Sequence, residues 1–202
     1  MPRSSEANEK LRAQSRARIV AGALRLFARF GYERATIKGI ADEAGVSQGL
    51  IYAHFATKAE LLQAIFAETM ADVRASFDLA ARAASPARRI EGLLRGSFEL
   101  LSANADFWRL SYSLRMQPGV LEDLGPELER WTDTILETLE GFLREAGAPD
   151  PAVDARLLFA LIDGLAQHYL LDPDDFPLDA CIERSVGFYR SLARQAKRRQ
   201  PA

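Results

Sequence analysis

The sequence predicts an all-α fold in two parts, a small N-terminal helical domain followed by a longer helical bundle. Apolar residues recur at three- and four-residue spacing through most of the chain. Helix start signals such as Ser85-Pro86 and Asp150-Pro151, and stop signals such as Gly31 and Gly147, divide these runs. We expect Gly125-Pro126 to break the chain, and a long helix to run from Pro126 to Ala146. No segment shows the alternation of a β-strand, so we expect helices alone.

Composition sets the limits for the class of protein. A chain of 202 residues permits one domain or two small ones, and its 48% hydrophobic content supports a packed core. It lacks any run of about 18 apolar residues and a secretory signal, so we expect a cytoplasmic protein without a membrane partner. The single cysteine, Cys181, excludes an internal disulfide and a multi-cysteine zinc site, and we expect it to be structural or inert rather than a redox sensor.

A helix-turn-helix pattern occupies residues 36–62. Two short helical runs flank Gly45, which can adopt the left-handed conformation that ends a helix, and Ser47, which can cap the next helix. Apolar residues such as Ile40 and Ile51 can pack the two runs against each other. The polar side chains expected outside this contact suit a DNA groove, because they can bond to base edges or phosphates. They are Ser47, Gln48, Tyr52 and His54.

A third helix follows directly. Residues 57–60 form a capping box, in which the Thr57 side chain caps the helix and the Glu60 side chain can accept from a backbone N–H at the helix start. Lys58 places a cation at the positive end of this helix dipole, so we expect a nearby phosphate to compensate it.

The charge distribution agrees with a DNA-binding N-terminus. Residues 1–60 carry ten Lys or Arg and six Asp or Glu, whereas residues 61–202 carry sixteen Lys or Arg and twenty-two Asp or Glu. A basic N-terminal part beside an acidic body is typical of a protein with one end in contact with phosphate, although a solvated basic helix gives the same count. We expect the basic end of the first helix, with Arg12, Arg16 and Arg18, to lie along the DNA backbone.

The motif contains a specific combination of residues. They are Thr36-Ile37, Ile40-Ala41, Ala44-Gly45-Val46-Ser47, Gly49, Ile51-Tyr52, His54-Phe55, Lys58 and Leu61-Leu62. This combination, covering about residues 10–66, resembles the TetR family of bacterial transcriptional regulators. The resemblance implies an N-terminal helix-turn-helix DNA-binding domain and a C-terminal helical bundle for ligand binding and dimerisation. The DNA-binding residues that we expect are Thr36, Lys38, Ser47, Gln48, Gly49, Leu50, Tyr52, His54 and Lys58.

Two positions depart from the commonest family pattern. Gly39 replaces an acidic or small helix former and should weaken its helix by about 1 kcal/mol relative to alanine. Leu50 is apolar at a position that faces DNA in the family, where it either contacts a thymine methyl group or belongs to the local core.

These patterns divide the chain into four segments. We expect a flexible tail at 1–9, the helix-turn-helix domain at 10–57, a connecting helix at 58–83 and a regulatory ligand-binding and dimerisation domain at 84–202.

The last two helices predict a homodimer. The helix after Asp150 is apolar nearly all round, which is more than one buried face requires. Helix-turn-helix proteins also bind DNA as two-fold dimers, with recognition helices about 34 Å apart. We therefore expect a four-helix interface between subunits, with Gly164 allowing close approach. Its residues are Leu157, Leu161, Gly164, Leu165, Val186 and Tyr189.

A small-molecule site in the bundle is implied by the resemblance. Aromatic residues, and polar residues that interrupt an apolar run, are the candidates to line it. They are Phe98, Phe107, Trp108, Tyr112, Trp131, Phe159, Asp163 and His168. For each aromatic the alternative is ordinary core packing, and His168 could instead be satisfied at an interface.

An enzyme is the competing class of function. A di-iron site in a helical bundle needs Glu-x-x-His pairs, but the residues three before His54 and His168 are Ile51 and Leu165. We expect no enzyme and no cofactor. The sequence instead predicts a regulator, most simply a repressor released from a palindromic operator by a small-molecule effector. The alternatives are a DNA-binding regulator without a ligand and a small-molecule-binding helical protein with a vestigial DNA-binding domain.

Overall fold

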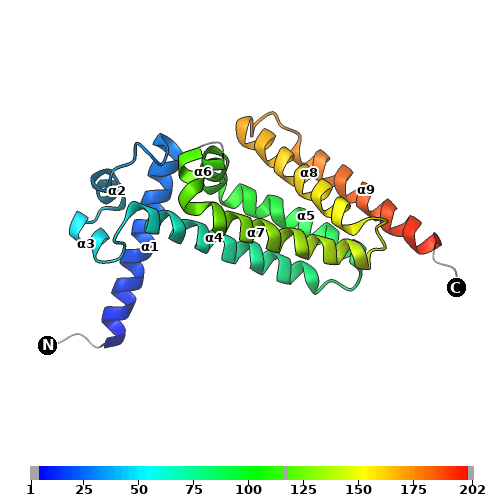
Figure 1. The fold of residues 1–202 in the computed structure, drawn as a ribbon, viewed down its shortest axis with the longest axis horizontal. Coiled ribbons are helices and arrows are strands. Elements are labelled where there is room, and N and C mark those ends of the chain that lie inside the picture. Colours follow the sequence, from blue (N-terminus) through cyan, green and yellow to red (C-terminus); the bar gives the residue numbers. More distant parts are fainter. Residues whose placement is uncertain (1–4, 116–117, 200–202) are drawn as a thin grey trace. The chain divides into compact units, whose positions relative to one another are not determined.

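The computed structural model describes residues 5–115 and 118–199, and all the regular secondary structure in these ranges is helical, which confirms the predicted fold class (Figure 1). The helices are α1 (Ser5–Phe30), α2 (Ile37–Ala44), α3 (Gln48–Tyr52), α4 (Lys58–Ala81), α5 (Pro86–Ala103), α6 (Ala105–Arg115), α7 (Pro118–Glu145), α8 (Pro151–Leu171) and α9 (Leu178–Arg199).

Local capping chemistry sets most of the boundaries. Gly31, Gly45 and Gly147 have φ angles of 83°, 63° and 79°, the left-handed conformation that ends a helix without strain only at glycine. The hydroxyl of Ser85 accepts from the backbone N–H of Arg88, and Asp150 caps α8 in the same way. These start and stop signals were read correctly from the sequence.

Two helices begin earlier than the sequence suggested. Helix α1 starts at Ser5, within the segment expected to be a flexible tail, because Glu6 in its first turn complements the helix dipole. Helix α7 starts at Pro118 and continues through Pro126, where we expected a break. Proline is compatible with a first helical turn, and the exposed position of Pro126 lets water satisfy the carbonyl group that loses its donor.

The chain forms two compact units. The first unit contains residues 1–69 and 106–124, and the second contains residues 70–105 and 125–202. Helix α6 therefore groups with the helix-turn-helix, although it lies within the segment expected to form the regulatory domain. Its Phe107 is fully buried against Phe66 of α4, with ring centroids 4.9 Å apart in an edge-to-face arrangement.

The core of the first unit is built on the contact between α1 and α2. Ile19, Ala23 and Phe27 of α1 are buried, as are Ile40 and Ala41 of α2. Gly22 lets the two helices approach closely. A Cβ atom at that position would lie 2.9 Å from the Cβ of Ala44 and 3.0 Å from its backbone nitrogen. The sequence pattern did not single out Gly22.

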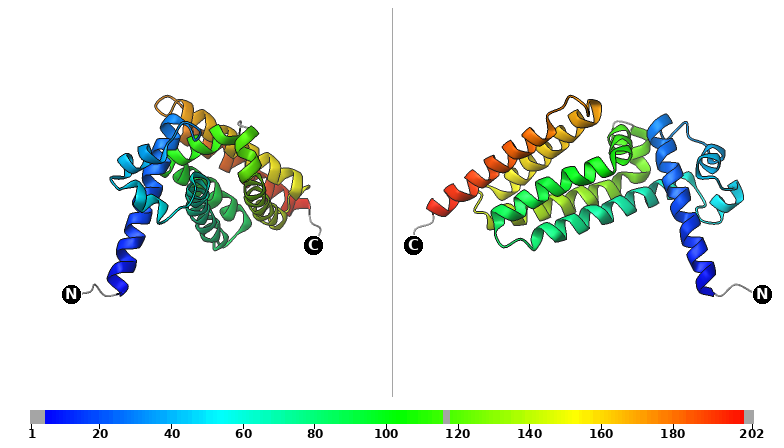
Figure 2. Two further views of the ribbon diagram at one scale, coloured as in Figure 1. Left: turned by 60° about the vertical axis from the view of Figure 1, so that its left-hand side comes forward. Right: turned by 180° about the vertical axis from the view of Figure 1, so that it is seen from behind.

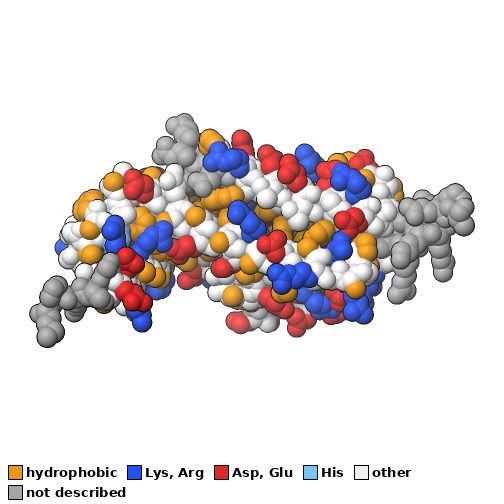
Figure 3. All heavy atoms as spheres, turned by 90° about the horizontal axis from the view of Figure 1, so that it is seen from below, with side chains coloured by type: hydrophobic (Ala, Val, Ile, Leu, Met, Phe, Trp, Pro, Cys, Tyr) orange, Lys and Arg blue, Asp and Glu red, His pale blue; other side chains and the backbone are white. Residues whose placement is uncertain are grey.

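In the second unit, α5 packs against both α8 and α9, which lie side by side as an antiparallel pair (Figures 1 and 2). Glu91 of α5 pairs with Arg95 of the same helix and with Arg190 of α9, and Arg95 also pairs with Glu183 at 2.7 Å. Acidic and basic side chains are likewise interspersed on the face drawn in Figure 3. The buried apolar residues include Ile90, Leu93, Leu94, Phe98, Leu101, Ala155, Leu158, Ile182 and Val186. Among the described residues, we find no helix that combines the length and apolarity needed to cross a bilayer.

Replacing Gly22 with alanine is expected to destabilise the protein by about 1–3 kcal/mol, because the nearest atoms include backbone and the helices must separate. The matched control is Gly141→Ala in α7, where an added Cβ meets nothing within 4 Å. That change should be neutral or stabilise by up to about 1 kcal/mol. Urea unfolding of both variants measures the difference, and equal midpoints would contradict the close contact.

Candidate nucleic-acid interface

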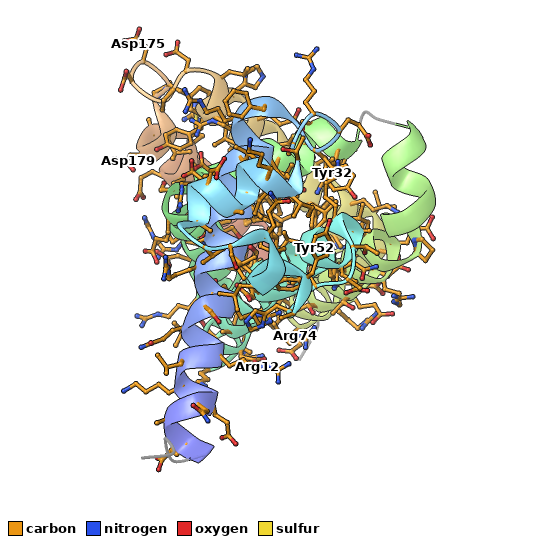
Figure 4. The ribbon with its side chains drawn as sticks, turned by 90° about the vertical axis from the view of Figure 1, so that its left-hand side faces the viewer. Arg12, Tyr32, Tyr52, Arg74, Asp175 and Asp179 are labelled. Carbon is orange, nitrogen blue, oxygen red and sulfur yellow. The ribbon has the colours of Figure 1, made fainter. Side chains whose placement is uncertain are left out.

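Helix α3 presents an open surface because a single residue anchors it. Ile51 is fully buried, whereas Gln48, Gly49, Leu50 and Tyr52 are exposed, Tyr52 to 56% (Figure 4). The helix begins where the Ser47 hydroxyl accepts from the backbone N–H of Leu50, at 3.2 Å.

The start of α2 is also exposed. Thr36 caps this helix by accepting from the backbone N–H of Gly39 at 3.0 Å, and Lys38 lies in its first turn with an exposed side chain. Exposed hydroxyl, amide and cationic groups on both helices have the chemistry that contacts phosphates and base edges.

An arginine of α1 holds the turn between α2 and α3. The Nη2 atom of Arg18 donates to the carbonyl oxygens of Ala44 and Gly45, at 2.9 and 2.8 Å. These carbonyls end α2 and have no partner within that helix, so the guanidinium completes the C-terminal cap. We expected Arg18 to lie along the DNA backbone, but its donors are directed at the turn.

His54 links the end of α3 to α1. Its Nε2 lies 2.8 Å from the Ser15 hydroxyl, which itself donates to the carbonyl of Arg12. The ring nitrogen is therefore the donor in the contact with Ser15. Burial, then the nearby Arg12 and Arg16, lower the pKa of His54, so the neutral ring uses its one N–H on Ser15. The expected donation from His54 to phosphate is accordingly wrong for the neutral ring.

Two other basic residues of α1 differ in their availability. Arg16 pairs with Glu68 at 2.5 Å and lies over the ring of Phe55, 5.4 Å from its centroid. Arg12, nearer the N-terminal end of α1, is exposed and has no ion-pair partner in the described part of the chain (Figure 4). Arg12 is therefore the better candidate to meet a phosphate.

Lys58 has an internal role. Its ammonium group donates to the carbonyls of Tyr32, Glu33 and Ala35, at 2.8, 3.2 and 3.3 Å, and lies 4.3 Å from the centroid of the Tyr32 ring. An ammonium group has three donors, and all three are used here. The expected phosphate contact of Lys58 is replaced by this clamp on the loop between α1 and α2.

Comparison with known proteins identifies the family. Residues 19–65 match the family model "Bacterial regulatory proteins, tetR family", and residues 81–188 match "Tetracyclin repressor-like, C-terminal domain". The chain belongs to the TetR family.

Its relatives in the TetR family are regulators of transcription. The chain is 30% identical over 189 residues to the HTH-type transcriptional regulator TtgR of Pseudomonas putida, covering 86% of this chain and 88% of TtgR. It is 27% identical over 146 residues to the repressor KstR2 of Mycobacterium tuberculosis, covering 68% and 70%. The solved structure of the fatty acid degradation regulator FadR from Bacillus halodurans shares the fold, with a TM-score of 0.77, 21% identity and coverage of 87% and 94%. This TetR-family protein is thus a DNA-binding transcriptional regulator.

The residues expected to form one ligand site in this TetR-family protein are divided between its two units. Phe107, Trp108 and Tyr112 lie in the first unit, and the other five lie in the second. Phe98 and Phe107 are core residues with almost no exposed surface. Trp108 is half-buried, and its indole N–H is buried without a hydrogen-bond partner.

The polar residues of α8 are also not gathered in a buried site. His168 is exposed and stacks on Phe176, with ring centroids 6.1 Å apart, and Asp163 accepts a hydrogen bond from Gln167 at 3.4 Å. The half-buried Phe159 lies on the same helix. His168 is therefore not buried within its own unit, and its place in a ligand site or an interface stays a prediction.

A recess of about 130 Å³ lies between α4 and α7 of the second unit. Trp131 is the only residue of the predicted ligand set that lines it. Which helix faces the apolar side of α4 depends on tertiary packing. The other apolar lining residues are Met70, Val73, Phe77, Ala81, Ile135 and Phe142, with Arg74 and Asp78 among the charged ones.

Helices α8 and α9 carry an exposed apolar face. Leu157 is 59% exposed and Phe188 is 57% exposed, and an added Cβ at Gly164 would meet nothing within 4 Å. Leu161 and Leu165 are half-buried.

Val186 and Tyr189, which we expected at the dimer interface, are instead buried inside the second unit, at 2% and 5% exposure. Burial, followed by the charge of Asp154, raises the pKa of Tyr189 to about 12. Both residues fall on the inner side of α9, so neither has surface left to offer a partner. Phe188, which lies on the outer side between them, was missed.

Replacing Lys58 with methionine should lower the free energy of unfolding by about 1–3 kcal/mol, because three carbonyl groups lose a charged donor. Lys38→Met is the matched control, since Lys38 is exposed without a hydrogen-bond or ion-pair partner in the described chain, and its stability should change by less than about 0.5 kcal/mol. Thermal and urea unfolding provide the measurement. A stable Lys58→Met variant would show that the clamp contributes nothing.

Proposed function

We propose that this regulator is a homodimeric repressor that binds a two-fold symmetric operator through α3 and releases it when a small molecule binds the helical body. The observation that carries the DNA-binding part is the exposed face of α3, presented on a motif that α1 holds at several points. Arg18 caps the turn, and Ser15 contacts His54. A recognition element held in one geometry loses little entropy on binding.

The side chains divide into two proposed roles. Gln48 and Tyr52 enter the major groove, where a glutamine amide can pair with an adenine edge. Thr36, Lys38 and Arg12 meet the sugar-phosphate backbone, which sets the position of the protein without reading sequence. Ser47 serves both as helix cap and as a groove contact. Gly49 has no side chain, so the DNA can approach the backbone of α3 closely at that position. His54 and Lys58 are assigned to the scaffold instead.

Dimerisation is supported by the exposed apolar face of α8 and α9. Exposed leucine and phenylalanine side chains on adjacent helices lose water when a second copy covers them, at about 25 cal/mol per Å² of apolar area. Gly164 and Gly187 leave open space between these side chains, so the partner's helices can approach closely. A two-fold pair of this kind matches a palindromic operator.

The recess between α4 and α7 is the proposed effector site. Its walls are mainly apolar and include Phe77, Trp131 and Phe142, so they suit a small apolar or aromatic molecule. A ligand that binds better to the DNA-incompetent state must weaken DNA binding by the same factor. The usual allosteric coupling of about 1–3 kcal/mol corresponds to about a 5- to 150-fold change in operator affinity.

The test of DNA recognition is a footprint on the DNA upstream of the protein's own gene at physiological salt. We expect protection of a two-fold symmetric site. Tyr52→Ala should lose at least tenfold in affinity for that site with an unchanged melting temperature, because Tyr52 is exposed and anchors nothing. Lys38→Met should weaken binding to every sequence and reduce the salt slope by about one unit per lost phosphate contact. Binding without a protected site, or full affinity of Tyr52→Ala, would contradict the assignment of α3.

The dimer is tested by Leu157→Arg, which places a charge on the exposed apolar face without disturbing the core. Sedimentation should show monomers, because a buried unpaired charge costs several kcal/mol. The same substitution at the exposed Leu79 of α4 provides a control that should remain dimeric. If Leu157→Arg also sediments as a dimer, the subunits meet elsewhere.

The effector site is tested by fluorescence. The chain has two tryptophans, so Trp108→Phe leaves Trp131 as the sole reporter. Benzene is a suitable probe, because an apolar cavity of about 150 Å³ can hold it and the recess, at about 130 Å³, is of similar size. We expect a saturable change in the fluorescence of Trp131 that is lost when Thr138→Phe fills the recess. A non-saturable change would place the effector elsewhere.

A further inference from the structure

The exposed face of α3 has an apolar edge and a polar edge. Successive residues of a helix are about 100° apart, so the direction opposite the buried Ile51 is close to that of Gly49. Gln48 and Leu50 therefore flank Gly49 on opposite sides. An added Cβ at Gly49 would meet only the Ser47 hydroxyl, at 4.0 Å, so the surface between the two side chains is open.

Leu50 is only partly covered by the local core. It is 36% exposed, whereas Ile40, Ile51 and Phe55 fill the interior of the motif and are between 0% and 6% exposed. Its backbone N–H donates to the Ser47 hydroxyl, a contact that any residue except proline could make. The structure thus leaves about a third of the surface of this large apolar residue exposed, on a face otherwise suited to polar recognition.

We propose that Leu50 makes recognition specific for thymine at one position in each half-site of the operator, by packing its methyl groups on the thymine 5-methyl group. This inference rests on the proposed function. Thymine is the only base that presents an apolar group in the major groove. The absence of a side chain at Gly49 lets the base edges approach α3 closely, and the amide of Gln48 reads a neighbouring base. Leu50 is therefore a specificity-determining residue.

The experiment uses the full-length protein and its footprinted operator, with thymines replaced one position at a time by deoxyuridine. This change removes only the 5-methyl group and keeps the base pair. Burial of one such group corresponds to about a fourfold change in affinity, or about fifteenfold when both half-sites are changed. We expect one thymine per half-site to show this loss.

Leu50→Ala should bind the thymine and deoxyuridine operators equally at that position, because the partner of the methyl group is gone. Alanine is a good helix former at this exposed site, so the variant should fold. Leu79→Ala is the matched control, another exposed leucine, and should keep the full difference. The double-mutant cycle between Leu50 and the methyl group measures their coupling directly.

The outcomes separate this inference from the function on which it rests. Specific operator binding without a deoxyuridine-sensitive thymine, or with a sensitivity that Leu50→Ala retains, overturns the role of Leu50 and leaves the regulator intact. Failure to find any two-fold protected site overturns the proposed operator recognition itself, and this inference with it.

Discussion

The position of the exposed face of α3 depends on the contact between α1 and the turn that joins α2 to α3. Gly22 brings the two backbones together at Ala44, and Arg18 bonds to the carbonyls that end α2. A five-residue helix such as α3 is too short to be stable alone. Its position therefore comes from the turn, from the buried Ile51 and from the side chains of α1.

Several polar residues of the motif stabilise this arrangement instead of facing outward. Lys58 satisfies three carbonyls of the α1–α2 loop, and His54 donates to Ser15. A loop with unpaired carbonyls near a helix end needs donors, and these side chains supply them. The exposed side chains of Gln48, Leu50 and Tyr52 take no part in this scaffold, which is why the proposed function assigns recognition to them.

The helical body shows how one residue step on a helix separates core from surface. Val186 and Tyr189 face inward toward the interior of their unit, whereas Phe188 faces outward. The same division separates Leu158 from Leu157 on α8. An apolar helix can bury one face within its own chain and offer the other to a second copy, and the proposed dimer uses this division.

The sequence by itself determined the all-α class, most helix ends and the identity of the motif, because these depend on spacing and on the capping chemistry of residues such as Gly45, Ser85 and Asp150. Tertiary structure decided which polar side chains remain available. The sequence placed Arg18, His54 and Lys58 at the DNA, because a charged or polar residue looks the same in the sequence whether its partner is a phosphate or a group elsewhere in the chain. Here the partners are carbonyl groups for Arg18 and Lys58 and the Ser15 hydroxyl for His54, 23 to 39 residues away. It also could not orient Val186 and Tyr189, because a helix that is apolar on several sides does not specify which side meets its neighbours. Those choices follow from long-range packing, which sequence periodicity does not encode.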